Sequence, residues 1–85
     1  MVNNYLDADG KIFVLPRKKT NRIELYKYLM EKFEDGRVYS EKEVNDIIFE
    51  NHSFNDTCLL RRELVEYGFL YRNNNGACYN KVNVR

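Results

Sequence analysis

The chain contains few of the residues on which catalytic and metal sites depend. It has one histidine, His52, expected at an exposed helix end, and two cysteines, Cys58 and Cys78, in no paired spacing. A metal site of known ligand spacing is therefore not expected. The four glycines form no glycine-rich phosphate loop, and Ser53 and Asp56 lie too close to His52 in the sequence to suggest a catalytic triad. We expect no enzyme activity, no cofactor and no metal.

Long apolar runs are also missing. No run approaches the roughly 20 residues that a membrane-spanning helix needs, and the polar start is unlike a secretory signal. Without export, the two cysteines are expected to be reduced thiols. The expected location is the cytoplasm.

The chain has little excess charge of either sign. Its 85 residues include 14 Lys and Arg against 13 Asp and Glu, for a formal net charge of +1. Domains dedicated to nucleic-acid binding are often strongly basic. This chain can attract phosphate only if its charges are segregated, so their distribution matters more than their sum.

Apolar residues recur in patterns that predict a strand and a first helix. The short apolar run Lys11–Leu15 predicts a strand, which Pro16, the single proline, ends. Residues Asn21–Phe33 have apolar positions at helical spacing. Asn21 and Glu24 have the spacing of a capping box, which places the start of this helix at Asn21.

Two further helices are expected in the middle of the chain. Ser40 and Glu43 form a second, clearer capping box, and this helix is expected to fade near Asn51. The third helix is expected to begin near Asn55 or Asp56, both good N-cap residues.

The last third of the chain predicts a helix stop and a hairpin. Gly68 stands where a left-handed residue ends the third helix, with Phe69 folding back onto Leu64 as in a Schellman motif. Two strand-like runs then flank Asn-Gly, a strong hairpin signal. Without a repeat or linker, residues 1–85 are expected to form one α+β domain. We predict a winged helix-turn-helix-like fold, with a short N-terminal strand, three helices and a C-terminal hairpin as the wing.

Several stretches of the sequence resemble one protein family. They are GRVYSEKEVN at 36–45, LRRELV at 60–65, GFLYR at 68–72 and Gly76 with Tyr79, together with YLD at 5–7, GK at 10–11 and LP at 15–16. These resemble the prokaryotic "domain of unknown function 2087" family, and the match covers nearly the whole chain. The resemblance implies a winged-helix-like fold and a regulatory context, because some members carry the label of transcriptional regulator. It implies no particular activity and no site residues.

Three groups of residues are candidates for contact with DNA. They are the basic segment where the first helix begins, the polar face of the third helix, and the hairpin. The candidates are Lys18, Lys19, Arg22, Asn55, Thr57, Arg62, Arg72, Asn74 and Lys81. Arg62 is the candidate for reading a guanine edge. The basic segment and the hairpin also fit an ordinary solvated surface.

Two residues near the third helix have other expected roles. Arg61 lies beside the apolar face of this helix, so we expect a partly buried ion pair with Glu41 or Glu43 that joins the third helix to the second. Asp56 places a negative charge at the end of the helix that would approach phosphate, which argues against DNA binding.

Two functions remain open from the sequence. The first is a transcriptional regulator that binds double-stranded DNA through the third helix and the wing. The alternative is a protein–protein interaction or oligomerisation module that binds another regulatory protein, or a second copy of itself, without touching DNA.

Overall fold

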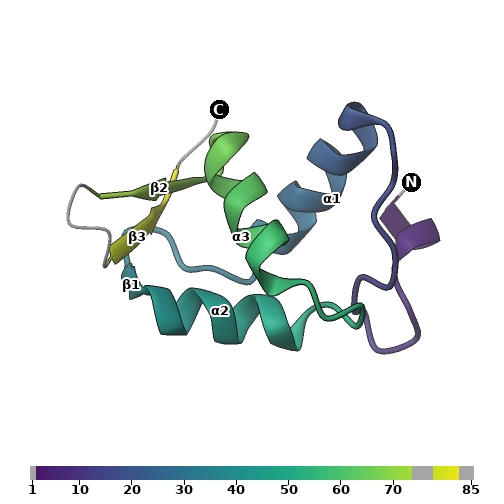
Figure 1. The fold of residues 1–85 in the computed structure, drawn as a ribbon, viewed down its shortest axis with the longest axis horizontal. Coiled ribbons are helices and arrows are strands. Elements are labelled where there is room, and N and C mark those ends of the chain that lie inside the picture. The colour runs from purple at the N-terminus through teal and green to yellow at the C-terminus, as the bar shows by residue number, and fades with distance from the viewer. Residues whose placement is uncertain (1, 74–77, 83–85) are drawn as a thin grey trace.

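The structure, a computed structural model, describes residues 2–73 and 78–82. Within these ranges it contains three α-helices, a three-stranded antiparallel sheet and a short 3-10 helix. The elements are η1 (Val2–Tyr5), α1 (Lys19–Met30), β1 (Val38–Ser40), α2 (Glu41–Glu50), α3 (Thr57–Glu66), β2 (Leu70–Arg72) and β3 (Cys78–Lys81). Figure 1 shows the sheet at one end and the N-terminal segment with η1 at the other, with α3 and α1 between them. The expected α+β class is confirmed.

The C-terminal strands form the expected hairpin. Strand β2 pairs with β3 in antiparallel register, with Leu70 opposite Lys81 and Arg72 opposite Tyr79. The strand order is β1-β3-β2, because β1 adds to the other edge of β3, where Tyr39 lies opposite Tyr79. Strand β1 was not predicted from the sequence. It is three residues long and ends directly at the cap of α2.

The prediction of an N-terminal strand at Lys11–Leu15 is wrong, because this segment forms no strand in the structure. Only Ile12 forms bridges, one antiparallel with Leu6 and one parallel with His52. Its N–H donates to the carbonyl of Asn51 at 2.9 Å, and its carbonyl accepts from Ser53 N–H at 2.9 Å. The segment therefore lies along the connection between α2 and α3 rather than in the sheet, and it buries Ile12 completely.

The start of α1 also differs from the prediction. The helix begins at Lys19, and its N-cap residue Lys18 accepts no side-chain capping bond. Asn21 and Glu24 therefore lie inside the helix, and the predicted capping box is wrong. The helix ends at Met30, and the next three residues continue in tighter turns up to Phe33, whose N–H donates to the carbonyl of Met30 at 3.1 Å.

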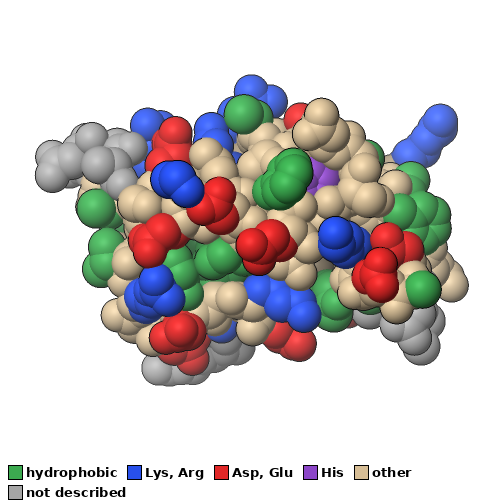
Figure 2. All heavy atoms as spheres, turned by 90° about the horizontal axis from the view of Figure 1, so that it is seen from below, with side chains coloured by type: hydrophobic (Ala, Val, Ile, Leu, Met, Phe, Trp, Pro, Cys, Tyr) green, Lys and Arg blue, Asp and Glu red, His purple; other side chains and the backbone are tan. Residues whose placement is uncertain are grey.

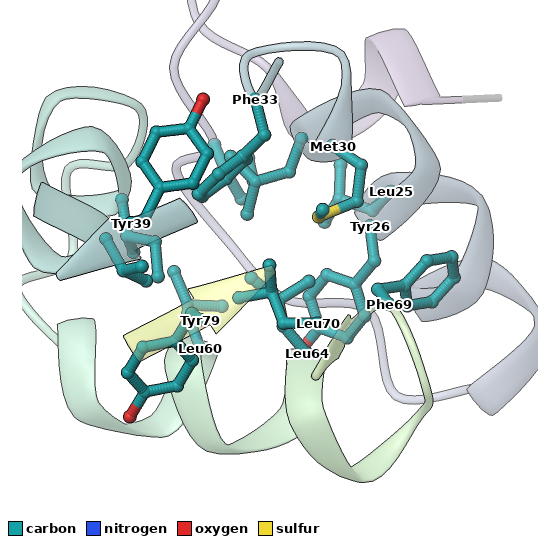
Figure 3. Packing of buried hydrophobic residues seen from close by; sticks show 14 residues of the cluster. Leu25, Tyr26, Met30, Phe33, Tyr39, Leu60, Leu64, Phe69, Leu70 and Tyr79 are labelled. Atoms are coloured by element: carbon teal, nitrogen blue, oxygen red, sulfur yellow. The ribbon is translucent and has the colours of Figure 1, made fainter. Parts of the chain in front are cut away.

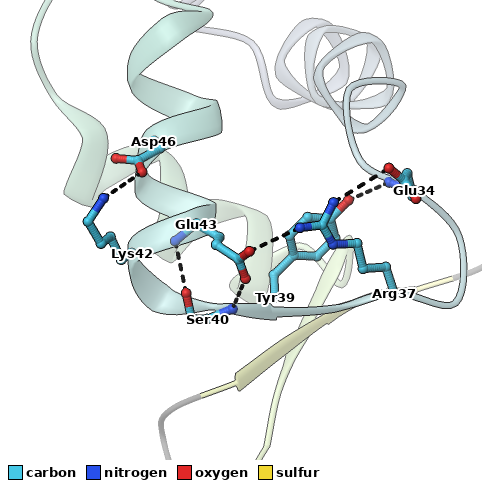
Figure 4. Close-up of polar contacts among 7 residues, drawn as sticks. All are labelled: Glu34, Arg37, Tyr39, Ser40, Lys42, Glu43 and Asp46. Atoms are coloured by element: carbon cyan, nitrogen blue, oxygen red, sulfur yellow. Dashed lines mark hydrogen bonds and ion pairs between the residues drawn. The ribbon is translucent and has the colours of Figure 1, made fainter.

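The capping of α2 follows the prediction. Ser40 Oγ accepts from Glu43 N–H at 3.1 Å, and Glu43 Oε1 accepts from Ser40 N–H at 2.9 Å (Figure 4). Both bonds satisfy donors that a helix start leaves free. The helix ends at Glu50 with Asn51 as its C-cap residue, as expected.

The two ends of α3 are also those predicted. Asp56 is the N-cap residue, and its carboxylate accepts from Leu59 N–H at 3.4 Å. At the other end Gly68 has φ +84°. Its N–H donates to Val65 at 3.1 Å, and Phe69 N–H donates to Leu64 at 2.8 Å. These two bonds define the Schellman motif.

Replacing Gly68 with alanine is expected to lower the free energy of unfolding by about 1 kcal/mol, because a Cβ disfavours a positive φ. Apart from the two neighbouring residues in the chain, no atom lies within 4 Å of the position of that Cβ, so the cost comes from the backbone conformation. Urea denaturation measures the change. Lys27→Ala, at an exposed helical position, is the control and should be nearly neutral. A Gly68→Ala variant as stable as the parent would contradict the assigned conformation.

The core lies where the three helices meet the inner face of the sheet (Figure 3). Each helix and each strand contributes to it, and aromatic rings pack across the elements. Phe33 and Tyr39 meet edge to face with centroids 5.2 Å apart, and Tyr26 meets Phe69 at 6.2 Å. The fully buried residues include Leu25, Tyr26, Leu29, Val44, Ile48, Leu60 and Leu64. Among the described residues, no helix is both long and apolar enough to cross a membrane.

Candidate functional site

A hollow of about 740 Å³ lies between α3, the start of α2 and the hairpin. We call it the α3 groove. Helix α3 supplies four of its lining residues, the hairpin two and α2 one. They are Arg61, Arg62, Val65, Glu66, Arg72, Tyr79 and Glu41. Three arginines and two glutamates thus share one concave surface.

Helix α3 presents a single row of side chains to solvent. Its three exposed residues are Cys58, Arg62 and Glu66, which are spaced four apart and therefore lie on one face. Leu60 and Leu64 are fully buried on the opposite face. Arg62 is exposed as expected, and the structure adds Glu66, one turn further along, which the sequence analysis missed. The same four-residue spacing from Arg62 could have identified it.

A partly buried polar cluster holds α3 against α1. Glu63 accepts from Arg22 Nη1 at 2.8 Å and from the hydroxyl of Tyr26, while Arg22 Nε donates to the carbonyl of Pro16 at 2.7 Å. Arg22 was a candidate for phosphate contact, but its guanidinium is committed to this cluster. Because Glu63 is held toward α1, the cluster fixes the rotation of α3 that leaves Arg62 and Glu66 exposed.

Tyr26 makes this cluster sensitive to high pH. Burial first, and then the hydrogen bond to Glu63, raise the pKa of Tyr26 far above its ordinary value. The fold therefore keeps the phenol protonated, whereas an unfolded tyrosine ionises near pH 10.

We expect the free energy of unfolding to fall as the pH rises above about 10, by up to about 1.4 kcal/mol per pH unit from Tyr26. Below that pH both states keep the proton, so the contribution is constant. Chemical denaturation at pH 8, 10 and 11 measures this slope. In Tyr26→Phe the slope should be smaller, and Phe13→Tyr at an exposed position should leave it unchanged. Equal slopes in the parent and Tyr26→Phe would contradict the argument.

Arg61 does join α3 to α2, but not through the predicted ion pair. Its guanidinium donates to the side-chain carbonyl of Asn45. Glu41 instead accepts from the hydroxyl of Tyr79 at 3.0 Å, and Glu43 is occupied by its capping box and by Arg37 at 3.0 Å. The predicted pair of Arg61 with Glu41 or Glu43 is therefore wrong, because each carboxylate already has a nearer partner.

The segment between α1 and α2 is held by a second polar cluster, shown in Figure 4. Arg37 lies 4.7 Å from the ring centroid of Tyr39 and contacts Glu34 at 3.5 Å as well as Glu43. Hydrogen bonding from the backbone of Ser40, followed by the charge of Arg37, lowers the pKa of Glu43. These contacts fix the start of α2, and with it Glu41 at the edge of the α3 groove.

The remaining basic candidates lie in different places. Arg72 is exposed on β2 and lines the α3 groove. Lys81 contacts Asp35 at 3.0 Å and donates to the carbonyl of Phe33 at 3.3 Å, so it ties β3 to the loop after α1. Lys18 and Lys19 are exposed at the start of α1, outside the groove.

The contact of Lys19 with Tyr67 locates the basic segment relative to α3. The ammonium lies 5.5 Å from the ring centroid of Tyr67, so the start of α1 lies beside the end of α3. Asn55 is exposed with φ 58°, and Thr57 is half-buried. Asn74, the candidate in the hairpin turn, lies outside the described residues.

His52 is buried, contrary to the expectation of an exposed residue at a helix end. Only 4% of its surface is accessible. Its Nδ1 lies 2.6 Å from the carbonyl of Ile48, and its Nε2 accepts from Asp56 N–H at 2.9 Å. These partners assign a neutral ring with the proton on Nδ1. The imidazole therefore links the last turn of α2 to the N-cap of α3.

A smaller hollow of about 320 Å³ lies next to this histidine. It is lined by Lys11, Phe49, His52, Ser53 and Asn55. Phe49 is 61% exposed, and Figure 2 shows a hydrophobic side chain directly beside the histidine. The rest of that face carries basic and acidic side chains intermixed, so it presents no area of one sign.

The described residues contain no group of three or more histidine, cysteine or acidic side chains that could hold a metal ion. Both cysteines are free thiols, Cys58 exposed and Cys78 half-buried. The polar side chains that line the α3 groove are three arginines, two glutamates and Tyr79.

Of the comparisons with known proteins, only the comparison with family models found a match. Neither the curated proteins nor the solved structures include a match to this chain. A family model described as "Uncharacterized protein conserved in bacteria (DUF2087)" matches residues 11–81, which include every helix from α1 onward, the whole sheet and all seven residues of the α3 groove. The chain belongs to the DUF2087 family of bacterial proteins.

Proposed function

We propose that this chain is a winged-helix, DNA-binding domain of a transcriptional regulator and has no catalytic role. The observation that carries the proposal is the shared position of Arg62 and Arg72 in the α3 groove. The element order α1-β1-α2-α3-β2-β3 with the sheet order β1-β3-β2 supports it, because winged helix-turn-helix domains place a recognition helix beside a hairpin in this way.

The two arginines have complementary roles in this proposal. Arg62 stands in the middle of the exposed row of α3, where a recognition helix meets base edges in the major groove. Arg72 stands on the hairpin, where a guanidinium meets the phosphate backbone. Lys18 and Lys19 supply further phosphate contacts at the start of α1, beside the end of α3.

The carboxylates of the groove limit the affinity. In the groove Glu41 accepts from Tyr79 and is half-buried, whereas Glu66 is exposed, as is Asp56 outside the groove at the N-cap of α3. Each exposed carboxylate that nears phosphate opposes binding. We expect a weak complex that depends strongly on salt, because phosphate contacts release counterions.

Titration of a labelled duplex at low and moderate salt tests the proposal. Arg62→Ala is expected to weaken binding by about tenfold. Arg72→Ala and the double variant Lys18→Ala/Lys19→Ala should weaken binding to all sequences and flatten its salt dependence.

Lys27→Ala is the matched control for these substitutions. It removes the same charge from an exposed position on α1 outside the groove, so binding should hardly change. No binding at low salt, or binding that ignores all of these substitutions, would exclude the proposal.

A second candidate function is protein interaction or self-association, and one observation favours it. Val38 and Tyr71 lie opposite Asn80 from either side, which puts all three on the outer face of the sheet. Val38 and Tyr71 are each 56% exposed. Light scattering across a range of protein concentrations tests self-association, and Tyr71→Ser should abolish any oligomer built on this face. A monomer at every concentration would argue against it.

A further inference from the structure

The exposed row of α3 contains a donor and an acceptor, not only a cation. Arg62 and Glu66 are both exposed and both line the α3 groove. Neither forms an ion pair with another described residue. Their order also disfavours a mutual pair, because at this spacing a helix prefers the acidic residue first. Both side chains therefore remain available to a ligand.

Glu66 needs a specific reason to face DNA. A carboxylate is repelled by phosphate, and it gains on a duplex only where it accepts a hydrogen bond from a base amino group. In the major groove glutamate accepts from N4 of cytosine, whereas arginine donates to O6 and N7 of guanine. Arg62 thus matches a guanine and Glu66 matches a cytosine, each in a different base pair.

The spacing of the two residues sets the spacing of the bases. Four residues of α-helix advance about 6 Å along the axis. Successive base pairs are about 3.4 Å apart. With α3 following the groove, Arg62 and Glu66 reach bases about two pairs apart.

We propose that Arg62 and Glu66 determine the sequence preference of this domain, reading a guanine and a cytosine about two base pairs apart in the major groove. The inference rests on the proposed DNA binding. On this proposal Glu66 makes a favourable contact with DNA sites that have a cytosine at the right position. On all other sites the DNA phosphates repel it.

Selection from a pool of duplexes with a randomised 12-base-pair centre tests the assignment. The parent should enrich sites that contain the guanine and the cytosine at this spacing. Arg62→Ala should lose the guanine preference and Glu66→Ala the cytosine preference, each without affecting the other. Glu66→Gln should shift the cytosine position toward adenine, because an amide pairs with N6 and N7 of adenine.

Affinity measured on single duplexes gives the sign of the Glu66 effect. On the enriched duplex, Glu66→Ala should bind about tenfold more weakly than the parent. On a duplex with the cytosine replaced, the same variant should bind at least as tightly as the parent. Glu24→Ala removes an exposed carboxylate outside the groove and should not discriminate between the two duplexes.

The possible outcomes distinguish failure of this inference from failure of the proposed DNA binding. If the parent binds no duplex in the pool, the proposed DNA binding fails and the inference with it. If the parent binds the whole pool with equal affinity, or if Glu66→Ala binds every duplex more tightly, DNA binding stands and the reading role is overturned. Since both side chains are exposed, circular dichroism melts should confirm that the variants fold.

Discussion

Glu63→Ala is expected to lower the free energy of unfolding by about 3 kcal/mol. The carboxylate is the shared acceptor for Arg22 and for the hydroxyl of Tyr26, and only 13% of the Glu63 side chain and 26% of the Arg22 side chain are accessible. Removing one partner of a fully buried pair leaves the other charge unpaired, which typically costs 3–5 kcal/mol, and this pair is only partly buried. We take the lower end, because Arg22 keeps partial access to water.

Urea denaturation of these and further variants separates the contributions within this cluster. Glu63→Gln keeps the volume and an acceptor but removes the charge, so it should cost less than Glu63→Ala. Tyr26→Phe combined with Glu63→Ala should cost less than the sum of the two single changes, because they remove the same contact. Glu24→Ala, exposed on α1, should change stability by less than about 0.5 kcal/mol. A loss below about 1 kcal/mol in Glu63→Ala would show that the cluster does not hold α3.

The features that the sequence predicted correctly depend on residues close together in the chain. The capping box of Ser40 and Glu43 spans four residues, and the Schellman motif at Gly68 spans six. The hairpin pairs neighbouring runs around Asn-Gly. In each case the hydrogen bonds join residues that are close together in the sequence. A short stretch of sequence is therefore enough to predict the feature.

The features that the sequence analysis missed depend on partners far along the chain. Ile12 pairs with the connection after α2, and β1 exists only because β3 returns to it. Arg22 appeared free for phosphate because Glu63, 41 residues later, is not visible from the local sequence. Arg61 donates to the side-chain carbonyl of Asn45, whereas both expected carboxylates have other partners. No spacing rule ranks such competing partners.

The candidate site could be predicted in part for the same reason. The exposure of Arg62 follows from the helical period, and Arg72 follows from the hairpin. Their meeting in one groove, with Tyr79 and Glu41 closing it, requires the tertiary fold. Lys81 shows that a cation in the hairpin sequence does not by itself indicate a DNA contact. In the structure it forms an ion pair with Asp35.

His52→Ala is the second substitution expected to cost about 3 kcal/mol. The imidazole satisfies the carbonyl of Ile48 and the N–H of Asp56, and truncation leaves both without their partner. An unsatisfied buried polar group costs about 1–3 kcal/mol, and the vacated space beside Phe54, whose ring centroid lies 4.8 Å away, adds a cavity penalty.

The effect of His52→Ala should be concentrated where α2 joins α3. Asp56 caps α3, so loss of the bond to its N–H should loosen the first turn of the helix that carries Arg62. Hydrogen exchange should therefore quicken at Asp56 and Leu59 before it does in α1. Ser53→Ala changes the exposed neighbour and should leave both stability and exchange unaltered. If His52→Ala unfolds at the same urea concentration as the parent, the connection is held by Ile12 and its backbone bonds rather than by the histidine.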